Sequence, residues 1–259
     1  MRRVVPLAAA LFAAACHPPP DPYGSETAFI PVVFRASNPG RPVWAPRVAL
    51  TNTSGAPETV RLTRWPPDAR DSEESVLELA PGQTLSVPSR IPLATVSSLF
   101  FEGSSPFCVR AEIVDRRGIA PPLAVPVLRA GDLARPGDRL RVGPIVDTTA
   151  ERSHFCFTGP GVERDAVPFR VRVRLTAPGT GTLVHESRFV LAGLPLVVDD
   201  PWKRFHLARG TPFDVEVTFL GSARGRQVAR GMWVYGITTV RVTSASRFLE
   251  TRVLRGSPR

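Results

Sequence analysis

The segment from Phe169 to Leu175 alternates strictly between apolar side chains and arginine. Successive side chains of a β-strand point to opposite faces, so this period places Arg170, Arg172 and Arg174 on one face and the apolar residues on the other. Shorter segments with the same character occur at 47–51, 58–63 and 213–219. The pattern predicts antiparallel strands that each turn one face to a core and the other to solvent.

Turn-forming residues separate these segments. The chain holds 28 proline and 20 glycine residues but only 2 methionine residues, and no long apolar helical face is found in it. The turn-rich loop 52–57 predicts a hairpin between 47–51 and 58–63. Pro81-Gly82 predicts a type II turn that pairs 75–79 with 84–87. We therefore expect an all-β protein with the short, regularly spaced strands of a sandwich.

The length of the chain and one turn-rich segment suggest how it is divided. The 259 residues are enough for two medium domains, and Gly143-Pro144 to Asp147 is the best boundary between them. We predict a signal peptide at residues 1–15, a proline-rich tether at 16–27, and two tandem Ig-like antiparallel β-sandwich domains at 28–145 and 146–259.

The N-terminal residues have the character of an export signal that ends at a cysteine. Arg2 and Arg3 precede an apolar run that is too short to cross a bilayer, and small residues lead to Cys16. Cleavage before Cys16 by a lipoprotein peptidase would leave a thiol that carries a lipid. Cleavage by an ordinary signal peptidase would instead leave a free thiol on a secreted chain. We expect a lipid anchor at Cys16 and a place in the bacterial cell envelope, periplasmic or surface-exposed.

The other two cysteines form an even pair. An exported chain matures in an oxidising compartment, so Cys108 and Cys156 are predicted to form a disulfide. Two buried, unpaired thiols are the alternative. His154 and Cys156 lie on the same predicted strand, but no second cluster of ligands follows nearby. We therefore predict neither a metal site nor a cofactor.

A set of spaced residues resembles an uncharacterised repeat domain of exported bacterial proteins that is common in acidobacteria-like genomes. Trp44 and Asn52 have the spacing of the Trp that precedes a Leu-x-Leu-x-Asn strand in that family, and Leu79-Ala80-Pro81-Gly82 matches its Leu-x-Pro-Gly turn. Val234-Tyr235-Gly236 and residues 243–248 resemble the end of the same unit. The resemblance implies a β-sandwich that often forms an accessory part of larger secreted proteins, and it implies no activity. In such a strand, Asn52 is expected to bond backbone groups at the strand end.

Charge marks two candidate ligand surfaces. The formal charge of +10 comes almost wholly from arginine, which a GC-rich genome also favours, so we expect no nucleic-acid partner. Arg170, Arg172 and Arg174, with Arg188 and Arg241, are candidates for a cationic face that meets an anionic glycan, a lipid headgroup or an acidic partner. An ordinary solvated face is the alternative. The loop that holds Trp202 and Lys203 combines aromatic and cationic side chains, as sugar-binding loops do, although a Trp docked on the core would give the same pattern.

Catalytic motifs are not evident in the chain. Gly103-Ser104-Ser105 lacks the frame of a nucleophile elbow, and the four histidine residues are scattered. We predict a non-catalytic envelope or secreted lipoprotein that acts as an interaction or structural module. Its candidate partners are another envelope protein or an anionic glycan. A carbohydrate-binding module of the cell surface is the alternative, and an enzyme whose site is dispersed over several loops is a third hypothesis.

Overall fold

The computed structural model is built almost entirely of β-strands, which confirms the all-β prediction. It describes residues 26–37, 43–65, 73–87, 95–159, 169–191, 196–222, 231–241, 243 and 245–255. The predicted signal peptide, the tether to residue 25 and the lipidation residue Cys16 lie outside these residues.

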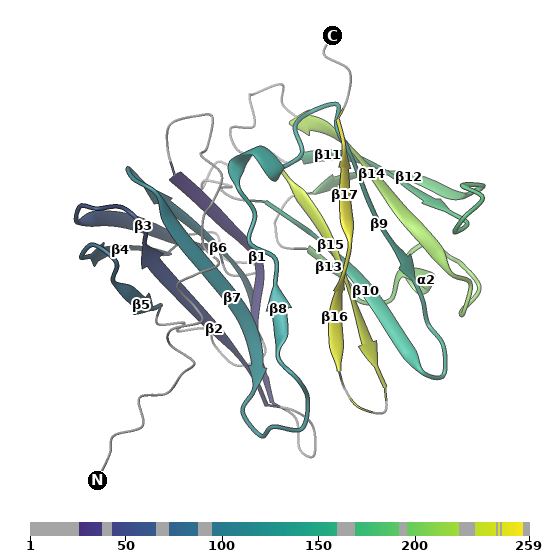
Figure 1. The fold of residues 1–259 in the computed structure, drawn as a ribbon. Coiled ribbons are helices and arrows are strands. Elements are labelled where there is room, and N and C mark those ends of the chain that lie inside the picture. The colour runs from purple at the N-terminus through teal and green to yellow at the C-terminus, as the bar shows by residue number, and fades with distance from the viewer. Residues whose placement is uncertain are drawn as a thin grey trace.

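Within the described residues, seventeen strands are assigned. They form four small sheets (Figure 1). Sheet 1 contains β4 (Glu73–Leu79), β3 (Glu58–Trp65), β6 (Thr95–Gly103) and β1 (Glu26–Ser37), in that order. Sheet 2 contains β2 (Val43–Asn52), β7 (Phe107–Asp115), β8 (Leu123–Val125) and β5 (Thr84–Ser86), which pairs with β2. Sheet 3 has the order β13 (Leu196–Val198), β10 (Glu151–Thr158), β15 (Trp233–Val240), β16 (Ser246–Leu249). Sheet 4 has the order β12 (Leu183–Leu191), β11 (Phe169–Thr176), β14 (Phe213–Ser222), β9 (Arg139–Ile145), β17 (Thr251–Leu254).

Two short helical segments complete the described elements. The 3-10 helix η1 (Ala130–Asp132) lies between β8 and β9, and helix α2 (Pro201–Arg204) follows β13. In the part of the chain that the structure describes, no helix has the length and apolar character needed to cross a membrane.

The prediction of two tandem Ig-like sandwiches is wrong. The four sheets follow one another in a ring that is similar to a four-bladed β-propeller. Sheets 1 and 2 are joined through β1, whose first part pairs with β6 and whose last residues pair with β2. The register of β1 shifts between Ile30 and Val33, on either side of Pro31, which has no N–H to donate to a ladder.

Both predicted hairpins are also wrong, although the strands themselves are present. β2 pairs with β1, β5 and β7, whereas β3 pairs with β4 and β6 in the other sheet. The turn after β4 forms as expected, with the N–H of Gln83 3.0 Å from the carbonyl oxygen of Ala80 and Gly82 at a φ of 69°. The strands on either side of it then separate, because β4 joins sheet 1 and β5 joins sheet 2.

Burial on both faces explains why the sheets close on one another. All of residues 27–33 in β1 are buried, as are residues 97–101 in β6, 155–158 in β10 and 233–238 in β15. A strand of a free-standing sandwich would leave alternate residues in solvent. The buried apolar residues of both halves form a single cluster instead, so sheets 1 and 3 share a core.

Hydrogen bonds between hydroxyl groups cross this shared core. The Ser98 Oγ lies 2.8 Å from the Thr158 Oγ1 and donates to the carbonyl oxygen of Pro31 at 2.9 Å. Ser98 belongs to β6 and Thr158 to β10, so polar groups in the junction between sheets 1 and 3 are paired rather than left unsatisfied.

The chain passes from one half to the other before the predicted boundary. Residues 139–145, which the sequence analysis assigned to the end of the first domain, form β9 and pair with β14 and β17 of sheet 4. The division into domains at residue 145 stays a prediction, and the pairing of β9 places the change of sheet earlier, near η1.

Candidate functional site

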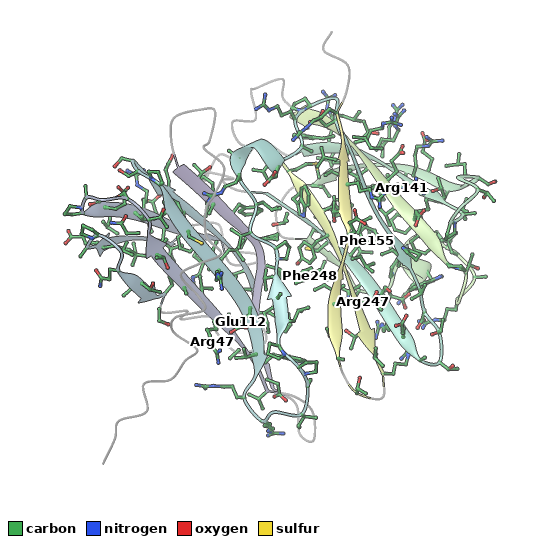
Figure 2. All side chains as sticks on the ribbon, in the orientation of Figure 1. Arg47, Glu112, Arg141, Phe155, Arg247 and Phe248 are labelled. Carbon is green, nitrogen blue, oxygen red and sulfur yellow. The ribbon has the colours of Figure 1, made fainter. Side chains whose placement is uncertain are left out.

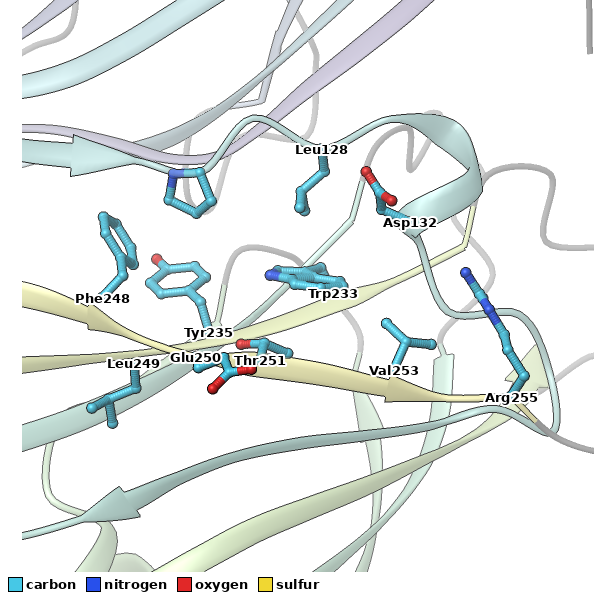
Figure 3. Close-up of a pocket in the computed structure, with 11 residues that line it drawn as sticks. Leu128, Asp132, Trp233, Tyr235, Phe248, Leu249, Glu250, Thr251, Val253 and Arg255 are labelled. Carbon is cyan, nitrogen blue, oxygen red and sulfur yellow. The ribbon is translucent and has the colours of Figure 1, made fainter. Parts of the chain in front are cut away.

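A cleft of about 660 Å³ lies where the two halves of the ring meet. One wall is the segment after β8, with Pro126, Leu128 and Asp132, and the other wall is formed by β15, β16 and β17 (Figure 3). The residues on the second wall are Trp233, Tyr235, Phe248, Leu249, Glu250, Thr251, Val253 and Arg255. Clefts between packed units are common ligand sites, so this cleft is the candidate functional site.

Three aromatic side chains face the segment that carries Leu128 and Asp132 (Figure 3). Trp233 and Tyr235 are two residues apart in β15, which puts both on the same face of sheet 3. Phe248 of β16 packs edge-on against Tyr235, with ring centroids 5.6 Å apart and an angle of 66° between the rings. Phe248 is partly exposed, whereas Trp233 and Tyr235 are 7% and 3% exposed. This wall of the cleft is therefore aromatic.

The indole nitrogen of Trp233 has no hydrogen-bond partner. Its Nε1 is shielded from solvent, and no acceptor of the described residues lies within reach. A buried N–H that donates no hydrogen bond lowers the stability of the fold by about 1–3 kcal/mol. The indole N–H of Trp233 is therefore an unused donor in the wall of the cleft. An acceptor that reached it as the cleft widened would recover part of that cost.

The other polar groups around the cleft already have partners within the protein. The guanidinium of Arg255 donates to Asp138 Oδ2 at 2.7 Å and to the Leu133 carbonyl oxygen at 2.9 Å. Glu250 is paired with Arg252, and the Thr251 hydroxyl donates to the Val234 carbonyl oxygen. The Arg255 bonds hold the C-terminal end of the described chain against the linker around η1, and the Thr251 bond holds β17 against β15.

A buried thiol lies beside one of these aromatic residues. Cys156 of β10 is directly opposite Tyr235 of β15, and both side chains are almost fully buried. Burial raises the pKa of the Cys156 thiol to about 12, and it raises the pKa of Tyr235 well above its ordinary value. A thiol held neutral in this way is a poor nucleophile. The pair therefore serves packing rather than covalent chemistry.

The predicted disulfide between Cys108 and Cys156 is not formed, because Cys156 is a free thiol. Cys108 lies in β7 opposite Thr51, and Cys156 lies in β10 opposite Tyr235, so the two cysteines occupy sheets 2 and 3. The Cys156 Sγ donates to the Phe157 carbonyl oxygen at 3.3 Å. The prediction of this disulfide, which was based on the even count of cysteines, is therefore wrong.

The predicted arginine face exists on the outer side of sheet 4. Val171, Val173 and Leu175 are fully buried, which leaves Arg170, Arg172 and Arg174 on the opposite side. Arg188 of β12 is directly opposite Arg172 and joins this face. Arg241 does not join it, because its guanidinium bonds Asp147 and the Thr148 carbonyl oxygen beyond the end of β15.

Trp202 does not contribute to a ligand surface. It lies in α2, where it is 2% exposed, and its ring packs edge-on against Phe213 with centroids 5.4 Å apart. Its indole N–H donates to the Thr211 carbonyl oxygen at 2.9 Å. Lys203 is exposed beside it, but without an accessible aromatic ring the predicted sugar-binding pair is not assembled.

Residues with metal-binding side chains are dispersed. Among the described residues, no group of three or more His, Cys, Asp and Glu side chains could hold a metal ion. Asp200 caps α2 through a bond from the Lys203 backbone N–H and pairs with Arg209 at 2.5 Å. His154 is partly buried, and desolvation lowers its pKa.

Comparisons with known proteins do not assign this chain to a family. No family model and no curated protein matches it. A crystal structure titled Thermotoga maritima 1070 aligns with 41% of this chain and 90% of its own, at 17% sequence identity and a TM-score of 0.31.

The cleft was not predicted from the sequence, although the sequence does place two of its aromatic residues on one strand face. Trp233 and Tyr235 stand in the predicted strand 227–235, and their spacing puts two aromatic side chains on one face. Leu128 lies far from them along the chain, and Phe248 lies on the next strand, β16. Only the packing of sheet 3 against the linker brings these residues together.

Proposed function

We propose that this protein is a non-catalytic interaction module and that the cleft between its halves binds an apolar side chain of another envelope protein. The observation that carries the proposal is the aromatic and aliphatic lining of an open cleft of about 660 Å³ whose wall contains an unpaired indole N–H. An extended peptide supplies both complementary groups, since an apolar side chain fits the lining and a backbone carbonyl accepts from Trp233 Nε1.

A sugar fits this cleft less well than a peptide. Sugars stack on broad exposed faces of aromatic rings, and Trp233 and Tyr235 are only 7% and 3% exposed. A peptide carbonyl needs only the edge of the Trp233 ring that carries Nε1 to be uncovered as the cleft widens. Carbohydrate binding stays the alternative, and the experiment below separates it from peptide binding.

Calorimetry with short blocked peptides tests the proposal. Acetylated, amidated Gly-Leu-Gly and Gly-Phe-Gly are titrated into the full chain, with Gly-Gly-Gly as the peptide that lacks an apolar side chain and N-acetylglucosamine oligomers as the sugar probe. We expect Leu and Phe peptides to bind and Gly-Gly-Gly not to bind. Equal heats for all three peptides would contradict the proposal, and binding of the sugar alone would replace it with a carbohydrate-binding function.

A pair of variants locates the binding. Phe248→Ala removes a partly exposed ring from the cleft, and we expect it to weaken peptide binding at least about tenfold, as loss of an interface anchor does. Ile119→Ala removes an apolar side chain that is 54% exposed in a distant loop and serves as the matched control. Equal affinities for the two variants would place the peptide elsewhere.

The cellular place of the module is proposed from its N-terminal residues. We infer that Cys16 carries a lipid and holds the chain in the bacterial envelope, because the small residues before it follow a charged and apolar leader. Mass spectrometry of the mature N-terminal peptide tests this. A chain that begins with acylated Cys16 is expected, and a mature chain with an unmodified thiol at that position would mean secretion without an anchor.

A further inference from the structure

One end of the outer face of sheet 4 is rich in arginine. The strand registers place Arg188, Arg172, Thr218, Arg139 and Leu254 in one row across all five strands. Arg170 lies beside this row on β11, opposite Val190 of β12. We refer to Arg139, Arg170, Arg172 and Arg188 as the cationic end.

The carboxylates of sheet 4 form ion pairs at the other end of the face. Arg174 pairs with Glu186 at 3.3 Å and with Glu216 at 3.5 Å, and Arg141 pairs with Asp214 at 2.5 Å. Within the cationic end, Arg139 reaches Glu216 only at 3.7 Å. Among the described residues, no carboxylate lies within ion-pair distance of Arg170, Arg172 or Arg188.

The cationic end carries unsatisfied polar atoms. Arg172 Nε and Thr218 Oγ1 are buried and have no hydrogen-bond partner among the described residues. The two residues are directly opposite each other on β11 and β14. Arg172 and Arg188 are directly opposite each other, which is unfavourable for two like charges. An anionic partner would relieve this repulsion and supply acceptors for the guanidinium groups.

Exposed aliphatic side chains surround the same residues. Val190 is 59% exposed, Leu220 is 39% exposed and Leu254 is 38% exposed. Leu220 adjoins the bulge opposite Arg170, and Leu254 is paired with Arg139. A soluble polyanion gives no reason to keep aliphatic groups in solvent. A bilayer that contains anionic lipids offers phosphates to arginine and an apolar zone to Val and Leu.

We propose that the cationic end of sheet 4 docks on a membrane surface that contains anionic phospholipids. The four arginines bind lipid phosphates, and Val190, Leu220 and Leu254 reach the boundary between headgroups and acyl chains. This contact uses a different face from the cleft and does not depend on the peptide binding proposed above. It would also orient the module on the membrane, which a lipid anchor alone does not do.

Vesicle binding measures this contact directly. The full chain carrying Cys16→Ser, which cannot be acylated, is mixed with phosphatidylcholine vesicles with or without about one third phosphatidylglycerol. The ratio of the two partition coefficients isolates the contribution of lipid charge, because any apolar contribution from the N-terminal residues is common to both. We expect the anionic vesicles to be preferred and the preference to fall as salt is added.

A charge-matched pair of double variants assigns the preference to the cationic end. Arg172→Gln with Arg188→Gln is expected to lower the ratio about thirtyfold, since each arginine near an anionic surface contributes about 1 kcal/mol. Arg47→Gln with Arg247→Gln removes the same charge from β2 and β16 (Figure 2) and is expected to change it less than about twofold. Val190→Ser is expected to weaken binding to anionic vesicles while leaving the net charge unchanged.

Three results would overturn the proposal. Equal effects of the two double variants would mean that net charge alone drives binding. Equal partition onto both kinds of vesicle would mean that anionic lipid is not recognised. Binding of soluble polygalacturonate by the wild type but not by the Arg172→Gln, Arg188→Gln variant, without a preference for anionic vesicles, would assign the face to an acidic glycan instead.

Discussion

The hydroxyl of Ser98 lies 2.8 Å from the hydroxyl of Thr158 in the buried junction between sheets 1 and 3. Ser98 comes from the first half of the chain and Thr158 from the second. Their contact, with the carbonyl of Pro31 as a shared acceptor, shows that the two halves are packed as parts of one core rather than as separate sandwiches.

Substitution of Thr158 tests this shared core. Thr158→Val keeps the shape of the side chain but removes its hydroxyl, and we expect the free energy of unfolding to fall by about 1–2 kcal/mol. Urea unfolding followed by circular dichroism and by tryptophan fluorescence should show one transition that shifts as a whole. Two separate transitions, of which only one responds to the substitution, would contradict the shared core.

The buried thiol of Cys156 should make stability depend on alkaline pH. Burial raises its pKa to about 12 in the folded protein, whereas an unfolded cysteine titrates near about 8.5. Below that lower value both states hold the proton. As the pH rises from there toward about 12, the unfolded chain alone releases it, so the folded state loses relative stability.

Comparison with Cys156→Ala isolates this effect. The stability advantage of the wild type over the variant should shrink between about pH 7.5 and about pH 10. Peptide mapping of the denatured, unreduced protein should also find Cys156 alkylated. Recovery of a peptide that links Cys108 to Cys156 would show that the thiol is not free.

Asn52 should stabilise the fold more than most polar residues. It is fully buried at the end of β2, and its Nδ2 donates to the carbonyl oxygens of Ala56 at 2.7 Å, Ala80 at 3.2 Å and Leu79 at 3.3 Å. Asn52→Ala removes these three bonds, although Ser54 Oγ still donates to the Ala56 carbonyl and the Gln83 N–H still donates to the Ala80 carbonyl. We expect a loss of about 1–3 kcal/mol in chemical denaturation. A loss below about 0.5 kcal/mol would mean that water replaces the amide.

Trp202 should affect stability and not ligand binding. Trp202→Ala opens a cavity beside Phe213, and we expect a cost of about 3–5 kcal/mol. Trp202→Phe, which keeps most of the ring and loses the bond to Thr211, should cost about 1 kcal/mol. A Trp202→Ala variant that kept its melting temperature but lost binding of a saccharide would restore the sugar-binding interpretation.

The strands could be predicted from the sequence because their signal is local. The alternation at 169–175 and the predicted role of Asn52 at a strand end are both confirmed. The pairing of strands could not be predicted in the same way. The Pro81-Gly82 turn has the expected form. The residues of the turn do not indicate that β4 pairs in sheet 1 and β5 pairs in sheet 2.

The candidate site was harder to predict because it is assembled from distant segments. Leu128 belongs to the linker between the halves, and Trp233 belongs to a strand near the end of the chain. For Trp202 a local signal did exist. Asp200 before Pro201 is a good helix start, and a short capped helix tends to dock its aromatic residue on the core.

The indole N–H resonance of Trp233 gives the most direct test of the proposed function. In ¹⁵N-labelled protein this signal is assigned by its loss in Trp233→Phe, and it is followed while the blocked Gly-Leu-Gly peptide is added. We predict a downfield shift as the peptide carbonyl accepts the bond, while the indole signal of Trp202, already bonded to Thr211, stays in place. A Trp233 signal that does not move at saturating peptide would contradict binding in the cleft.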